Sequence, residues 1–283
     1  RIWGGEAGFT DGDAAIARFR SPQGLDRAGG HLYVADTENH AIRRIDLKTG
    51  KVSTVAGTGE LGRGGQAIAK PRSTALRSPW DVAVAGPEHG ASRPEELVIF
   101  IAMAGLHQLW ALLPAQDRIA PMAGTGEEDH VDGPPTEAAL AQPSGLCLFG
   151  RHLFFADSEV SSVRFVDLQS RQVGTLTGAG LFDFGDEDGS GVAVRMQHPM
   201  GLTVAEDTVW VADTLNHKVK GIGLKTQVTT TLVGGDPAVL CEPGGIARLG
   251  GYLAVADTGN HRIRVIRRAT GEIRDLPLTA PRR

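Results

Sequence analysis

The segment Ser21-Pro22-Gln23-Gly24-Leu25 is a proline-led strand start, and it has four counterparts along the chain. After a start comes a short apolar run such as Leu32-Tyr33-Val34-Ala35, then a polar hairpin, then a strand of mixed polarity. This recurrence predicts a tandem repeat whose units have about the length of one propeller blade. The counterparts are Ser78-Pro79-Trp80-Asp81-Val82, Gln142-Pro143-Ser144-Gly145-Leu146, His198-Pro199-Met200-Gly201-Leu202 and Glu242-Pro243-Gly244-Gly245-Ile246.

The apolar runs are short and rich in β-forming residues, and turn residues bound them. None shows a sustained period of 3.6 residues, which favours strands over helices. Four antiparallel strands per unit, stacked radially, would bury both faces of each second strand. The sequence therefore predicts an all-β propeller that forms one domain over residues 1–283. Its five complete four-stranded blades are expected at about 21–57, 78–124, 142–178, 198–234 and 242–278.

One strand is left over at the start of the chain. Arg1-Ile2-Trp3-Gly4-Gly5 has the form of a fourth strand that ends in paired glycines, as at Val233-Gly234-Gly235. The last blade already has its own fourth strand. We therefore expect residues 1–5 to be the outer strand of a sixth blade whose inner strands lie upstream, in a longer protein from which this chain is excised.

Composition limits the classes of partner. The 283 residues include 41% hydrophobic residues, enough for a large core, and 29 basic against 33 acidic residues without a block of like charge. Nucleic acid is a poor default partner because phosphate binding needs a basic face. No stretch has the length and apolar character of a membrane span, so a soluble domain without a membrane partner is expected.

Acidic and basic residues recur seven positions apart in four blades. The acids end the second strand, and in the second blade both positions change together, to Met103 and Trp110. A hairpin centred on Asn39 and His40 would place residues 36 and 43 directly opposite each other, which predicts structural ion pairs. The pairs are Asp36 with Arg43, Asp157 with Arg164, Asp213 with Lys220, and Asp257 with Arg264.

Histidines also recur, at one position of the hairpin, with Ser161 in their place in the third blade. Metal ligation would require the imidazoles to converge on one ion, whereas separate blades hold them apart, so turn capping is predicted and no metal. The usual propeller winding places the glycine- and acid-rich linkers at about 57–77, 124–141 and 178–197 on the same face as these hairpins. That face is the expected recognition surface, with Asn39, His40, His107, Asn216, His217, Asn260 and His261.

The linkers contain acidic glycine-rich pieces, Asp11-Gly12-Asp13, 129–133 and 186–189, which are similar to fragments of calcium loops. They lack the bidentate Glu that closes such a loop, so solvated turns are expected and no cofactor. The sequence also lacks a Gly-x-Ser-x-Gly elbow and a His-Glu-x-x-His helix. No catalytic residue is assigned.

The stretches Val34–Arg43 and Val255–Arg264 resemble the NHL repeat, and Ile101–Trp110, Ala156–Arg164 and Phe182–Gly189 are similar to segments of the thioredoxin-like/NHL protein family. The resemblance implies a six-bladed propeller, an upstream thioredoxin-like domain and a cytoplasmic protein. It implies no catalytic residue for the propeller. Because this sequence has no Cys-x-x-Cys, any redox chemistry would belong to the neighbouring domain.

These observations predict a monomeric, non-catalytic scaffold that binds a protein or peptide and holds it near a redox neighbour. One alternative is a metal-dependent propeller lyase or lactonase, as related NHL and gluconolactonase-like folds imply. A second alternative is an RNA-binding NHL domain, which would require Arg43, Arg44, Arg72 and Arg77 to cluster on one face.

Overall fold

The computed structural model describes residues 3, 5–64, 68–86 and 96–277. Within this part of the chain helical structure is limited to short 3-10 turns, and no helix has the length and hydropathy of a membrane span. Three residues of the leading strand predicted at 1–5 lie outside the described residues, and Trp3 and Gly5 are not in a strand. The sixth-blade strand is therefore not confirmed.

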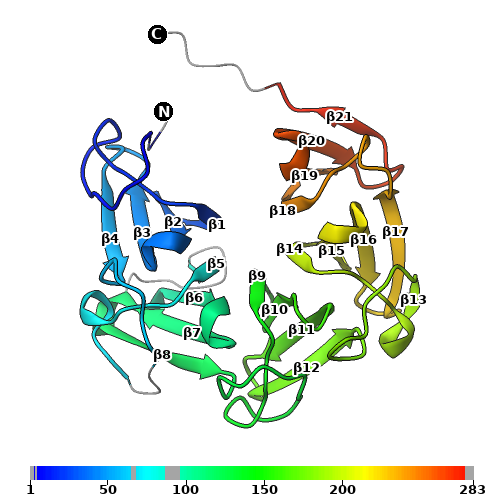
Figure 1. The fold of residues 1–283 in the computed structure, drawn as a ribbon, viewed down its shortest axis with the longest axis horizontal. Coiled ribbons are helices and arrows are strands. Elements are labelled where there is room, and N and C mark those ends of the chain that lie inside the picture. Colours follow the sequence, from blue (N-terminus) through cyan, green and yellow to red (C-terminus); the bar gives the residue numbers. More distant parts are fainter. Residues whose placement is uncertain (1–2, 4, 65–67, 87–95, 278–283) are drawn as a thin grey trace. The chain divides into compact units, whose positions relative to one another are not determined.

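Two compact units make up the chain, residues 1–128 with 134–143 and residues 129–133 with 144–283. The first unit contains blades 1 and 2, each a four-stranded antiparallel sheet (Figure 1). Blade 1 consists of β1 (Pro22–Ala28), β2 (His31–Asp36), β3 (Ala41–Asp46) and β4 (Val52–Ala56). Blade 2 consists of β5 (Pro79–Ala85), β6 (Val98–Met103), β7 (Gln108–Leu113) and β8 (Arg118–Ala123).

The second unit contains blades 3, 4 and 5, which confirms the predicted all-β fold of five propeller blades. Blade 3 consists of β9 (Pro143–Phe149), β10 (His152–Asp157), β11 (Ser162–Asp167) and β12 (Gln172–Thr177). Blade 4 consists of β14 (Pro199–Ala205), β15 (Thr208–Asp213), β16 (Lys218–Gly223) and β17 (Val228–Gly234), with β13 (Gly189–Ser190) added beside β17. Blade 5 consists of β18 (Pro243–Leu249), β19 (Tyr252–Asp257), β20 (Arg262–Arg267) and β21 (Ile273–Asp275).

Each blade begins with the same backbone turn. The residue before the leading proline has a positive φ, for example 47° at Ser21 and 48° at Glu242. The proline then opens the first strand, which has an unpaired edge, so its missing N–H costs no ladder hydrogen bond. This turn explains why the x-Pro signature marks the blade starts so reliably.

The linkers run along the outer edges of the blades. Gly12 pairs with Val52 of β4, Gly133 pairs with Val173 of β12, and β13 pairs with β17. An outer strand would otherwise present a row of free N–H and C=O groups. The linkers therefore cover the edge strands instead of forming independent loops.

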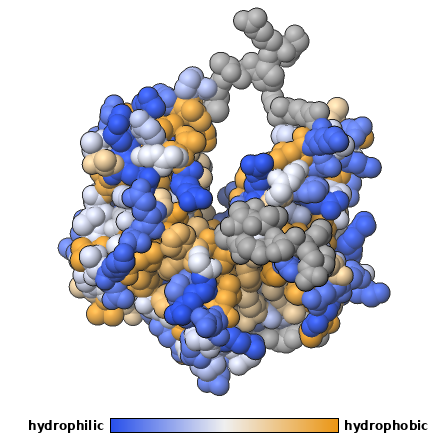
Figure 2. All heavy atoms as spheres, turned by 180° about the vertical axis from the view of Figure 1, so that it is seen from behind, coloured by the Kyte–Doolittle hydropathy of each residue, from blue (hydrophilic) through white to orange (hydrophobic). Residues whose placement is uncertain are grey.

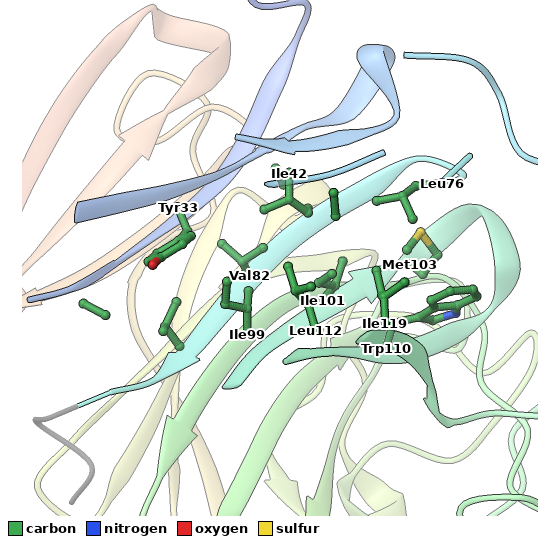
Figure 3. Close-up of a cluster of buried hydrophobic side chains, with 14 residues drawn as sticks. Tyr33, Ile42, Leu76, Val82, Ile99, Ile101, Met103, Trp110, Leu112 and Ile119 are labelled. Atoms are coloured by element: carbon green, nitrogen blue, oxygen red, sulfur yellow. The ribbon is translucent and has the colours of Figure 1, made fainter. Parts of the chain in front are cut away.

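Packing between consecutive blades is apolar. In the first unit Ile99, Ile101 and Met103 of β6 pack in one cluster with Val82 of β5 and Ile42 of β3 (Figure 3). In the second unit Leu202 and Val211 of blade 4 share a cluster with residues of blade 3. Burying one such side chain contributes roughly 1.5–3 kcal/mol, so this packing supplies most of the cohesion of each unit.

Glycine at the fourth position of the five-residue blade start allows a close approach between blades. A Cβ at Gly145 would lie 2.2 Å from the Met200 carbonyl oxygen, and a Cβ at Gly201 would lie 2.3 Å from that of Gly244. A Cβ at Gly245, the same position of blade 5, would meet only the Cβ of Ala256, at 3.8 Å. The glycine is therefore a contact requirement in blades 3 and 4 but not in blade 5.

This difference provides a matched pair of variants. Gly201→Ala should lower the free energy of unfolding by about 1–3 kcal/mol, because the methyl group must displace backbone of the next blade. Gly245→Ala should leave it within about 0.5 kcal/mol. Denaturant unfolding measures both values, and equal losses would contradict this account of the joint.

Candidate functional site

A buried guanidinium connects the hairpin of blade 1 to the linker before it. Arg43 Nη1 lies 2.6 Å from Asp36 Oδ2, and Nη2 lies 2.8 Å from Oδ1 of Asp11 in the linker. Two backbone carbonyls also accept hydrogen bonds from Arg43, and its guanidinium carbon lies 5.0 Å from the ring centroid of Phe9. The fork of Arg thus joins three separate segments at one point.

The linker carboxylate also binds the outer strand. Asp11 accepts hydrogen bonds from the N–H and the hydroxyl of Thr54, both at 2.9 Å. Burial alone would raise the pKa of Asp11, but the Thr54 N–H and the Arg43 guanidinium outweigh burial and hold the pKa below its ordinary value. Asp11 therefore stays ionised and holds the linker against β4.

Blade 3 repeats this arrangement. Arg164 bridges Asp157 at 2.7 Å and Asp132 at 2.8 Å, and Asp132 accepts both donors of Thr175 at 2.9 Å. The spacing is the same as in blade 1: the linker acid precedes the cation by 32 residues and the threonine by 43.

Blade 4 has a lysine in place of the arginine. The ammonium of Lys220 lies 2.9 Å from both Asp186 and Asp188 of the linker but 3.8 Å from Asp213. Burial raises the pKa of Asp213 to about 6, although Asn216 and the Gln197 N–H donate hydrogen bonds to it. The single ammonium of Lys220 thus binds both linker acids closely, whereas Asp213 at the end of the strand has no close cation among the described residues.

Blade 5 takes its second acid from its own outer strand. Arg264 pairs with Asp275 of β21 and lies 3.7 Å from Asp257, which Arg262 approaches at 2.9 Å. In blade 2 the apolar replacements Met103 and Trp110 are both buried. The structure thus brings together all four acid–base pairs named from the sequence.

Two details of the sequence interpretation are wrong. Asp36 is paired with Ala41 and Arg43 with Val34, so the ion pairs lie diagonally across the hairpin and not directly opposite. The reason is the 3-10 turn η1 (Thr37–Asn39), which shifts the centre of the hairpin by one residue. The acidic linker pieces are also not merely solvated turns, because Asp11, Asp132 and Asp188 bind the buried cations.

The recurrent histidines link consecutive blades. His40 has a φ of 48° at the end of η1, and its Nδ1 accepts a hydrogen bond from the Ser78 N–H at 3.1 Å. His217 does the same for the Glu242 N–H at 3.0 Å, and His107 accepts from the Gln142 N–H. In blade 3 the Ser161 hydroxyl oxygen accepts from the His198 N–H at 3.3 Å. His261 of blade 5 is exposed, with no hydrogen bond to its ring among the described residues.

The asparagines of the predicted recognition surface also make internal contacts. Asn39 donates to Gly8 O and Asp36, Asn216 donates to Gly185 O and Asp213, and Asn260 donates to Pro237 O and Asp257. Each amide therefore connects its hairpin to the preceding linker. The hairpin asparagines therefore hold the linkers in place.

Several of the most exposed apolar side chains lie on these linkers. Phe182 is 87% exposed and Phe184 is 60% exposed, while Leu61 and Ile68 are exposed on the linker of the first unit. On the face seen in Figure 2, hydrophilic residues cover much of each unit and hydrophobic residues appear among them. The sequence interpretation did not single out the two phenylalanines, although the Phe-Asp-Phe-Gly pattern in a polar linker was the available signal.

A small cavity lies beside the network of blade 1. It has a volume of about 300 Å³ and is lined by Phe9, Asp11, Thr54, Gly57, Thr58 and Arg72. Among the described residues no group of three His, Cys, Asp or Glu side chains is placed to hold a metal ion. Of the four arginines that RNA binding would require, Arg43 is fully buried in its ion network and is not available to a phosphate.

Known proteins place these repeats in a family. The family model of the NHL repeat matches residues 19–45 and 240–266. NHL repeat-containing protein 2 from Homo sapiens is 40% identical over 313 aligned residues, which cover 98% of this chain and 43% of that protein. The chain is an NHL-repeat β-propeller.

A plant relative has a different name. The protein SUPPRESSOR OF QUENCHING 1, chloroplastic, from Arabidopsis thaliana is 39% identical over 291 residues, which cover 95% of this NHL chain and 27% of the relative. The chain thus spans less than half the length of either protein.

Solved structures agree on the fold of the NHL chain. A chain in the crystal structure of a nidogen/laminin complex superposes with a TM-score of 0.65 at 15% identity, covering 90% of this chain and 79% of that one. A streptogramin B lyase gives 0.60 at 13% identity, covering 96% and 73%. At such low identity these similarities concern the fold alone.

The difference between Lys220 and Arg43 generates a stability prediction. Because Asp213 stays protonated in the folded protein up to about pH 6 but ionises near 3.8 when unfolded, stability falls as pH rises between these values. Lys220→Arg should supply the missing hydrogen bond, lower the pKa of Asp213 and raise the free energy of unfolding at neutral pH by about 1–3 kcal/mol. Denaturant unfolding at several pH values measures this change.

Arg43→Lys in blade 1 is the reciprocal control. In this variant the free energy of unfolding should fall more steeply as pH rises from about 4 to about 6, whereas Lys220→Arg should make this fall smaller. If both variants keep the wild-type dependence on pH, the fork of the guanidinium does not control the strand acids.

Proposed function

We propose that this NHL propeller is a non-catalytic, monomeric scaffold that binds a protein or peptide. The observation that carries the proposal is the exposure of Phe182 and Phe184 on a linker whose base is fixed. Exposed aromatic side chains on a rigid support are typical of interaction hot spots, because they bury a large area at low cost in conformational entropy.

The base of this linker is held at several points. The Gly185 N–H donates to Met196 O at 3.0 Å, and Asp186 and Asp188 both bind Lys220. Asp183, between the two phenylalanines, pairs with Arg195 at 3.3 Å. The rings therefore project from a loop that is closed at its base, and a partner would not have to order the whole linker.

Peptide selection tests this proposal directly. Peptides selected from a random display library against the wild-type chain should lose at least about tenfold in affinity for the Phe182→Ser/Phe184→Ser variant, because the aromatic anchors are missing. Leu249→Ser, which replaces another exposed apolar residue on β18, is the matched control and should retain binding. Calorimetry with purified peptides measures these affinities. Undiminished binding to the double variant would exclude the linker as the recognition surface.

We also propose that blade 1 and blade 5 each have a face that packs against a further blade, as the resemblance to six-bladed propellers implies. Leu25 of β1 is 61% exposed, whereas its counterparts Val82 and Leu202 are 1% and 4% exposed. Among the described residues of blade 5, the Thr258 hydroxyl donates to Ala256 O of its own strand, whereas Thr37 and Thr214 also donate to Pro79 O and Pro243 O of the next blade. Both faces thus carry residues that in the other blades contact a neighbouring blade.

Leu25→Ser tests for this further blade. In the 283-residue chain the substitution should change stability by less than about 0.5 kcal/mol, because the side chain is exposed. In the complete natural polypeptide it should cost about 2 kcal/mol or more, because the same side chain would be buried. Equal effects in both proteins would exclude the further blade.

The thioredoxin-like neighbour and the cytoplasmic location stay proposals that rest on the family resemblance. One relative has the word chloroplastic in its name, so the cytoplasmic proposal for this chain needs its own test. The sequence of the complete reading frame and imaging of the tagged full-length protein test the two proposals.

A further inference from the structure

The hydrogen bonds that connect consecutive blades differ in one chemical respect. At His40, His107 and His217 the acceptor is an imidazole nitrogen, Nδ1, whereas at the equivalent Ser161 it is a hydroxyl oxygen. A neutral imidazole has one acceptor nitrogen, but a protonated imidazole has an N–H on both nitrogens and accepts nothing. The histidine joints therefore require a neutral ring, and the serine joint has no such requirement.

Both kinds of joint occur inside the second unit. Ser161 connects blade 3 to His198 at the start of blade 4, and His217 connects blade 4 to Glu242 at the start of blade 5. The three cap residues share the same left-handed backbone, with φ values of 48° at His40, 49° at Ser161 and 57° at His217. The same backbone thus accommodates either side chain, and only the acceptor chemistry changes.

The charges around His40 come from three segments. Burial disfavours the imidazolium most, Glu38 of the same hairpin favours it, Arg77 ahead of β5 disfavours it, and Glu60 of the linker after β4 favours it. The net result is a pKa of His40 below its ordinary value, so the ring is neutral at physiological pH. At the other joint His217 accepts from the backbone of an acidic residue, Glu242, and Lys218 follows it in β16.

A second hydrogen bond at each joint does not depend on pH. The hydroxyls of Thr37, Ser158 and Thr214 donate to Pro79 O, Pro199 O and Pro243 O at 2.7–2.9 Å. A joint that loses its imidazole hydrogen bond therefore keeps this contact and its apolar packing. Loss of the imidazole hydrogen bond would therefore loosen the blade start while these contacts hold the blades together.

We propose that His40 and His217 are acid-releasable latches, which free the starts of blades 2 and 5 on acidification while the Ser161 latch keeps the start of blade 4 in place. For His40 the sign follows from the burial of its ring. For His217 it follows from the hydrogen bond itself, which only a neutral ring can accept. A histidine with a lowered folded pKa contributes stability that is complete above 6.5, the pKa of a free imidazole, and is lost as pH falls through the folded value. Acidification thus acts on the amides of Ser78 and Glu242, and the Gln142 N–H, which donates to His107 Nδ1, is a third amide of this kind.

Amide resonances of the 283-residue chain test the latches. Between about pH 7.5 and pH 5 the Ser78 and Glu242 amide protons should shift upfield with the midpoint of the His40 and His217 rings, and their exchange protection should fall about fivefold, the loss expected for one hydrogen bond. His40→Ser and His217→Ser copy the natural latch of blade 3. In each variant the facing amide should stop responding to pH while thermal unfolding at neutral pH changes little.

The reciprocal variant Ser161→His transfers the property. It should make the His198 amide respond to the ring at position 161, measured as the difference between variant and wild type, because His198 also has an imidazole of its own. The proposal would be overturned if the wild-type Ser78 and Glu242 amide resonances did not change on protonation of the facing rings. It would also be overturned if these resonances still changed with pH after the serine substitutions.

Discussion

In blades 1, 3 and 4 the position of the linker depends on a buried cation that binds two carboxylates from different segments, one at the end of the second strand and one in the linker. Arg43 and Arg164 satisfy both acids with one planar fork. Removing such a charge from water is expensive, and the cost is recovered only when every partner is in place. The cation therefore fixes the distance between hairpin and linker, and the linker acid in turn fixes the outer strand through a threonine. This constraint places the linkers, and with them the exposed aromatic side chains.

Comparison of the blades shows that this ion network is not needed to form a blade, but is needed to hold a linker against it. Blade 2 forms the same four-stranded sheet with Met103 and Trp110 in place of the ion pair, so the blade itself does not need the charges. An apolar pair of this kind packs at least as well as a buried ion pair. What it cannot do is hold a linker carboxylate. Blade 4 lies between these cases, because Lys220 holds two linker acids and leaves Asp213 with a raised pKa.

Much of this architecture could be predicted from the sequence, because x-Pro starts and apolar runs are local signals. The acid–base pairs were also visible, since both members recur at a fixed spacing within one hairpin. The linker acids were missed because their partners lie 32 and 43 residues away, although both spacings repeat in three blades. The role of the histidines at the joints needed coordinates, because the donor is a backbone N–H of the next blade and has no side-chain signature. The outward position of Phe182 likewise follows from backbone geometry, with a φ of 66°.

Internal charges therefore hold the surface linkers in position. Hydrogen exchange in Asp188→Ala tests this claim most directly, because the substitution removes the linker acid that binds both Lys220 and the Thr231 N–H. The account predicts that amides of residues 185–190 and Thr231 lose protection while those of β14, β15 and β16 keep it. Unchanged protection in the linker would contradict the claim that the buried cation positions it.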